Sequence, residues 1–135
     1  MLRRSIQLRA VNITSGLSAS VSCLVEAQDT AVAMRSGSVD VLATSRLIAM
    51  CEEAACLAVA KALPEGHTSV GVRVQFDHLA PISVGSEVVA EAVLERVEGR
   101  RLVFTVSVTD PVGLVGAGRI TRVVVDTERF LAKAR

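Results

Sequence analysis

Few residues in this chain can exchange protons near neutral pH, and His78 is the best placed of them. The sequence has two histidines. His67 follows the turn Pro64-Glu65-Gly66 and is expected at the surface. His78 closes an alternating run directly before Leu79-Ala80-Pro81, so it should stand at the end of a strand. There it can line a cleft and act as an acid or base, although a structural histidine bonded to the backbone fits the same pattern.

Two further candidates, Thr44 and Glu52, belong to a long apolar stretch. On a helix, Glu52 and Glu53 would point about 100° apart, so one should face solvent and the other be buried or line a pocket. A carboxyl group held among apolar residues needs a partner, and such a group suits catalysis. The alternative is that both glutamates are solvated at the surface. Thr44 would either cap the helix or, with nearby backbone amides, hold an anionic oxygen.

The pattern of apolar residues predicts the elements that must position these side chains. Apolar residues recur at helical spacing from Asp40 to Leu63, with Ser38 or Asp40 as the N-cap and Pro64 ending the helix. Alternating runs predict strands over 17–27, 69–79, 87–97, 100–109 and 114–126, and 127–135 is expected to form a short closing helix. We therefore predict an α+β fold in which an antiparallel β-sheet wraps a long central helix, as one domain spanning 1–135.

Composition excludes several classes of function. A net charge of +1 and three phenylalanines, without Trp or Tyr, argue against a nucleic-acid surface. No apolar run is long and uncharged enough to span a bilayer. The three cysteines lack zinc or redox spacing and are expected to be buried, reduced thiols of a cytoplasmic protein. The segment with Arg3, Arg4 and Arg9 has the composition of a transit peptide, but we interpret it as a surface strand or arm.

Together these residues resemble the fluoroacetyl-CoA thioesterase group of hotdog-fold enzymes. The similarity runs from Ser38 to Phe130. Its motifs are Ala43-Thr44 with Glu52 eight residues after Thr44, Gly71 with His78 seven residues later, Val97-Glu98-Gly99-Arg100-Arg101-Leu102, and Gly116-Ala117-Gly118. The resemblance implies a hotdog fold with active sites at a dimer interface.

The resemblance also assigns roles. It implies that Thr44, Glu52 and His78 are catalytic and that Gly71 lies against the acyl group. Two helical residues eight apart are about 12 Å apart along the axis, at about 1.5 Å per residue. Either Thr44 therefore precedes the helix and folds back towards Glu52, or the site combines two subunits. Glu53 stands where the fluoroacetyl-specific enzyme has Trp, and the loop 28–38 has no aromatic lid residue, which argues against selectivity for fluoroacetyl groups.

We therefore predict a homodimeric acyl-CoA or acyl-thioester hydrolase. Glu52 would act as nucleophile or as base for water, His78 would transfer protons, and Thr44 would orient the reacting groups. No metal and no cofactor beyond the CoA of the substrate is expected.

Two alternatives stay open from the sequence. One is a non-catalytic hotdog protein that binds an acyl thioester. The other is an acyl-CoA dehydratase or hydratase, whose usual His-Asp pair would here be Asp77-His78 on a strand. The sequence does not specify the acyl chain. Nor does it specify whether the thioester is to CoA or to a carrier protein, or whether the enzyme is a dimer or a tetramer.

Overall fold

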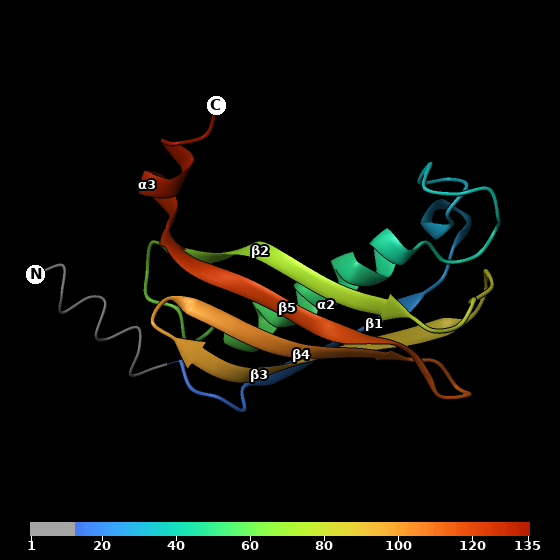
Figure 1. The fold of residues 1–135 in the computed structure, drawn as a ribbon, viewed down its shortest axis with the longest axis horizontal. Coiled ribbons are helices and arrows are strands. Elements are labelled where there is room, and N and C mark those ends of the chain that lie inside the picture. The colour runs from blue at the N-terminus through green and yellow to red at the C-terminus, as the bar shows by residue number, and fades with distance from the viewer. Residues whose placement is uncertain (1–12) are drawn as a thin grey trace, which may run out of the picture.

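A computed structural model describes residues 13–135 and confirms the predicted α+β fold. In Figure 1 the long helix lies behind a curled antiparallel sheet. The elements in chain order are β1 (Ser18–Leu24), the 3-10 helix η1 (Ala27–Asp29), α2 (Thr44–Val59), β2 (His67–His78), β3 (Glu87–Glu98), β4 (Arg101–Thr109), β5 (Leu114–Asp126) and the short helix α3 (Thr127–Leu131). The arm predicted around Arg3, Arg4 and Arg9 lies outside the described residues.

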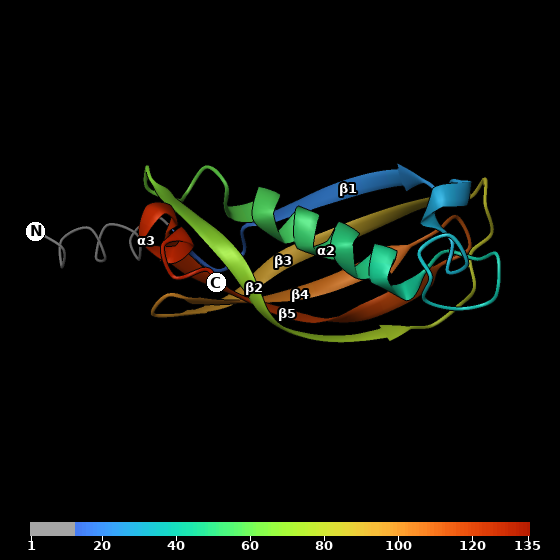
Figure 2. The same ribbon diagram turned by 90° about the horizontal axis from the view of Figure 1, so that it is seen from above.

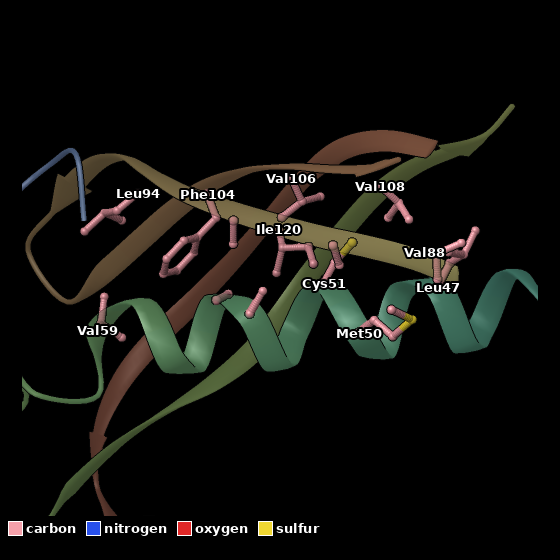
Figure 3. Packing of buried hydrophobic residues seen from close by; sticks show 14 of the residues in the cluster. Leu47, Met50, Cys51, Val59, Val88, Leu94, Phe104, Val106, Val108 and Ile120 are labelled. Atoms are coloured by element: carbon pink, nitrogen blue, oxygen red, sulfur yellow. The ribbon is translucent and has the colours of Figure 1, made fainter. Parts of the chain in front are cut away.

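The sheet has the strand order β1-β3-β4-β5-β2, and every neighbouring pair is antiparallel. Alternate residues of each strand therefore point towards α2. The core is apolar and formed mostly by aliphatic side chains from both layers, as Figure 3 shows for Leu47, Met50, Cys51, Val59, Val88, Leu94, Phe104, Val106, Val108 and Ile120. Leu57 faces solvent at 52% exposure, whereas its neighbour Ala58 packs against the core.

Helix α2 is shorter than predicted at both ends. The N-cap is Ala43, without a side-chain cap, and not Ser38 or Asp40. The preceding residues are held extended, because Val41 forms a bridge with Ser83 and Leu42 forms one with Thr30. A backbone held in this way cannot adopt helical dihedral angles, so helix formation begins only at Thr44.

The structure differs from the predicted strand over 17–27 and the predicted loop over 28–38. Strand β1 ends at Leu24, and η1 follows with Glu26 as its N-cap and Asp29 in a capping box. Asp29 is buried, and its Oδ1 accepts a hydrogen bond from Arg46 Nε at 3.1 Å. This pair ties the connection to the first turn of α2. No helix within residues 13–135 is long and apolar enough to cross a bilayer.

Strand β2 contains a β-bulge that bears on the site. Gly71 pairs with Arg122 of β5, but Arg73 pairs with the adjacent Thr121, so Val72 is an extra residue. One extra residue reverses the alternation of side chains along a strand. Gly71 and His78 are seven positions apart, so in a regular strand they would point to opposite faces. Because the bulge adds one residue between them, both point to the face towards α2.

Candidate active site

The first residue of α2 and the last residue of β2 meet at one end of the fold (Figure 2). Thr44 Oγ1 lies 2.7 Å from His78 Nδ1, within hydrogen-bonding distance. An open hollow of about 320 Å³ adjoins the pair and is lined by Val41, Thr44, His78, Leu79, Ala80 and Pro81. His78 Nε2 is buried and has no hydrogen-bond partner among the described residues. The structure thus brings Thr44 and His78 together beside a mainly apolar hollow.

Glu52 lies at a different point, near the middle of α2. As helical spacing predicts, Glu53 is exposed, whereas the Glu52 side chain is only 37% exposed. Arg122 Nη1 donates to Glu52 Oε2 at 3.2 Å. The guanidinium thus holds this carboxyl group in one position. A methyl group on Gly71 would lie only 2.5 Å from Glu52 Oε2, so glycine leaves the space that the carboxylate occupies.

Sequence reasoning missed Arg122, which is the buried cation of the site. Its side chain is 8% exposed. Ser69 fixes its orientation, because Arg122 Nε donates to Ser69 Oγ at 2.9 Å and Nη2 donates to the Ser69 carbonyl at 2.8 Å. A signal was available in the sequence: Arg122 stands between Ile120 and Val124, at alternate positions that both face the core. A charged residue on the apolar face of a strand requires a partner.

One chain therefore holds two half-sites, Thr44–His78 and Glu52–Arg122 beside Gly71. Thr44 and Glu52 are both helical. They are about 12 Å apart along the helix axis, at about 1.5 Å per residue. The suggestion that Thr44 precedes the helix and folds back is therefore wrong. His67 was expected at the surface; it is partly buried, and its Nδ1 lies 3.1 Å from the Glu65 carbonyl oxygen.

The three cysteines differ in exposure. Cys51 is buried, whereas Cys23 and Cys56 are half-exposed, so the expectation of three buried thiols is wrong for these two. Burial, together with the neighbouring Glu52 carboxylate, raises the pKa of the Cys51 thiol to about 12. Only the thiolate reacts readily with alkylating reagents.

We expect iodoacetamide at pH 8 to modify Cys23 and Cys56 in the folded protein and to leave Cys51 intact. Peptide mapping before and after unfolding measures this, and rapid labelling of Cys51 in the folded state would contradict it.

The Cys51 thiol ionises near pH 9.0 in the unfolded chain, whereas its pKa in the folded protein is about 12. The stability that comes from keeping this thiol protonated should therefore be lost as the pH rises across that window.

A long central helix wrapped by a curled antiparallel sheet is the hotdog architecture. Residues 25–128 match the model of the family described as fluoroacetyl-CoA-specific thioesterase. The chain is also 38% identical, over 71% of its length and 69% of the relative's, to the fluoroacetyl-CoA thioesterase of Streptantibioticus cattleyicolor. The chain belongs to this family, and it is an acyl-CoA thioester hydrolase.

Solved structures agree with this assignment. The structure of the fluoroacetyl-CoA thioesterase FlK superposes with a TM-score of 0.84 at 30% identity, covering 90% of this chain and 94% of that one. A hot-dog-like protein from Thermanaerovibrio acidaminovorans gives a TM-score of 0.84 at 31% identity, with 91% of both chains covered. A thioesterase superfamily member from Thermus thermophilus gives 0.82 at 27% identity, with 89% of both chains covered.

Proposed function

We propose that Glu52, His78 and Thr44 carry out the hydrolysis of an acyl-CoA in this enzyme. The observation that carries the proposal is the Glu52 carboxylate, held beside Gly71 by a buried arginine. Held in this way, the carboxylate can take a proton from water or attack the thioester carbon itself.

In the water route, the water oxygen bonds to the thioester carbon as Glu52 accepts the water's proton. Negative charge then develops on the carbonyl oxygen, where the amides at the start of α2, which have no partner within the helix, would stabilise it. The carbon–sulfur bond breaks, and His78, oriented by Thr44, gives a proton to the departing thiolate. The products are a carboxylic acid and free CoA.

We propose that the enzyme is a homodimer and that each active site takes its two half-sites from different copies. Gly71 and His78 are seven residues apart on β2, a separation of about 23 Å along the strand at about 3.3 Å per residue. A single chain therefore holds Glu52 too far from His78 for both to act on one thioester. Strand β2 also lies at an edge of the sheet, where a second copy can approach.

Subunit complementation tests this arrangement. Glu52→Gln and His78→Ala proteins should each be inactive alone. Mixed and refolded in equal amounts, they should recover about a quarter of the wild-type rate, because half of the dimers are then mixed and each mixed dimer holds one intact site. Recovery of no activity, with mixed dimers demonstrated by mass spectrometry, would show that the site lies within one chain.

For the substrate, we propose an acyl-CoA without selectivity for the fluoroacetyl group. Mutants of FlK have been solved with fluoroacetate and CoA and with acetyl-CoA. In this chain Glu53 is exposed, and the connection before α2 carries no aromatic side chain between Gln28 and Ser38. Thiol release from a panel of acyl-CoAs should show similar kcat/KM for acetyl-CoA and fluoroacetyl-CoA. A fluoroacetyl preference above about 100-fold, or about 2.7 kcal/mol, would contradict this.

Gly71→Ala should lower kcat by about 100-fold, because the new methyl group would displace the Glu52 carboxylate from its position. The fold should tolerate the change, since the atom that must move is the end of a flexible side chain. Steady-state kinetics and the thermal unfolding midpoint measure the two effects. Unchanged kcat would show that the carboxylate position is not critical.

We also propose that the enzyme works without a metal or other cofactor and resides in the cytoplasm. Within residues 13–135, no three His, Cys, Asp or Glu side chains gather where they could hold an ion. All three cysteines are free thiols, as expected in a reducing compartment. Activity that is unaffected by EDTA dialysis would agree with this proposal, and its loss and recovery with added metal would refute it.

A further inference from the structure

Phe76 lies between the two half-sites of one chain, on the face of β2 towards α2. It precedes His78 by two residues in an alternating part of the strand, so both side chains point to the same face. At about 3.3 Å per residue, their Cα atoms are about 7 Å apart. The Phe76 side chain is half-buried and packs against the hydrophobic core. An aromatic ring is therefore the neighbour of His78 along the strand.

The ring of Phe76 is seated on Gly116 of the adjacent strand β5. Gly116 is the cross-strand partner of His78, so the ring reaches diagonally towards the level of His78. A Cβ atom on Gly116 would lie only 2.5 Å from Phe76 Cζ and 3.1 Å from Cε2. Glycine at this position thus leaves the space that the ring fills. The pair Phe76–Gly116 determines how much space remains beside His78.

Ile48 occupies the corresponding place on α2. It is four residues after Thr44 and four before Glu52, and residues at this spacing lie on the same face of a helix. Its side chain is half-buried. The region between the two half-sites is therefore apolar on both elements, with Ile48 on the helix and Phe76 on the strand. Such a surface suits an acyl chain and not the charged CoA portion of a substrate.

We propose that Phe76, seated on Gly116, is a specificity-determining residue that closes the acyl pocket beyond His78 and restricts the enzyme to short acyl groups. The inference rests on the proposed function, in which the thioester carbon reacts beside His78. The hollow next to Thr44 and His78 is open, so the large and polar CoA portion takes that side. The acyl group is then directed along β2, where the Phe76 ring is the first side chain on the same face.

Phe76→Leu should extend the range of acyl chains. Leucine lacks the far end of the ring, which is the part that reaches Gly116. The ratio of kcat/KM for hexanoyl-CoA to kcat/KM for acetyl-CoA should rise by about 10-fold or more, since one methylene in an apolar pocket changes such a ratio by about 10- to 200-fold. Thiol release from acetyl-, butyryl- and hexanoyl-CoA measures the ratio, and an unchanged ratio would overturn the proposal.

Gly116→Ala should change the same ratio in the opposite direction. The new methyl group would push the Phe76 ring from its seat towards the acyl group, and the ratio should fall by about 10-fold. The two substitutions lie on different strands, so opposite shifts cannot come from a general loosening of the fold. If folded Gly116→Ala protein shows no fall, the seat does not control the space beside His78 and the proposal fails. If this variant does not fold, Phe76→Leu decides alone.

Phe104→Leu is the matched control. It makes the same chemical change on β4, where the ring is fully buried in the core (Figure 3). It should lower the thermal unfolding midpoint. The ratio for the two acyl-CoAs should stay within about twofold of wild type, because distant sites act independently. Equal changes in the ratio from Phe76→Leu and Phe104→Leu would show that core packing in general, and not the position beside His78, governs chain length.

Titration calorimetry separates this inference from the proposed function. Glu52→Gln protein should bind acyl-CoA without hydrolysing it, so its affinities for acetyl-CoA and hexanoyl-CoA can be compared with and without Phe76→Leu. The added substitution should favour hexanoyl-CoA by about 10-fold. If wild-type protein hydrolyses no thioester and this shift is found, Phe76 limits the acyl chain and the proposed function fails. If wild-type protein is active and neither ratio shifts, the proposed function stands and the inference fails.

Discussion

Glu52→Gln should lower kcat for acyl-CoA hydrolysis by about 1,000-fold, the largest loss expected from a change of so few atoms. The amide keeps the size of the side chain and can still contact Arg122, but it can neither accept a proton from water nor attack the thioester. KM should change little, because the carboxylate acts in the transition state and not in binding the CoA portion. Steady-state thiol release, with unfolding measured in parallel, gives both quantities.

Glu53→Gln is the matched control for this prediction. It makes the same chemical change one residue further along the same helix, where the side chain is exposed. Its kcat and KM should stay within about twofold of wild type, since nothing in the structure ties it to the site. Equal losses from both substitutions would mean that helix charge, and not the carboxylate at Gly71, governs turnover.

Arg122→Met should reduce both stability and activity. The change removes a buried guanidinium and leaves the Ser69 groups and the Glu52 carboxylate without their donor. We expect a loss of about 2–3 kcal/mol in the free energy of unfolding, below the value for a fully buried pair because Glu52 is 37% exposed. Activity should fall by about 100-fold as the carboxylate loses its orientation. Urea unfolding and steady-state kinetics measure the two effects.

Arg119→Met provides the comparison, since Arg119 lies three residues earlier on β5 and also pairs with a glutamate. That pair is exposed, with the Arg119 side chain 58% and the Glu95 side chain 34% accessible. Solvent screens such pairs, so the free energy of unfolding should change far less than for Arg122→Met. Equal destabilisation by both substitutions would show that burial does not distinguish the two arginines.

The class of fold and most strand positions could be predicted because they depend on local periodicity. Within the predicted strand 87–97, Val88, Ala90, Ala92 and Leu94 occupy alternate positions, which predicts that they share one buried face, and all four side chains are at most 1% exposed. Helical spacing predicted that only one of Glu52 and Glu53 would face solvent, and the structure exposes Glu53. These features follow from the geometry of one element and need no knowledge of its neighbours.

The start of α2 could not be read in the same way. Ser38 and Asp40 are good N-cap residues, but bridges from Val41 and Leu42 to distant segments hold the chain extended up to Ala43. Tertiary contacts here override a local preference. The result places Thr44 on the helix, and this position excludes a single-chain contact with Glu52.

By itself, the sequence determined the hotdog architecture, the class of activity and the identity of the candidates Thr44, Glu52, His78 and Gly71. Only the tertiary structure decided how they are grouped. Their grouping depends on cross-strand register, which pairs Gly71 with Arg122 and makes Val72 the extra residue. A shift of one position moves every later side chain to the other face of the sheet. Register arises from contacts between segments far apart in the chain, so no local pattern contains it.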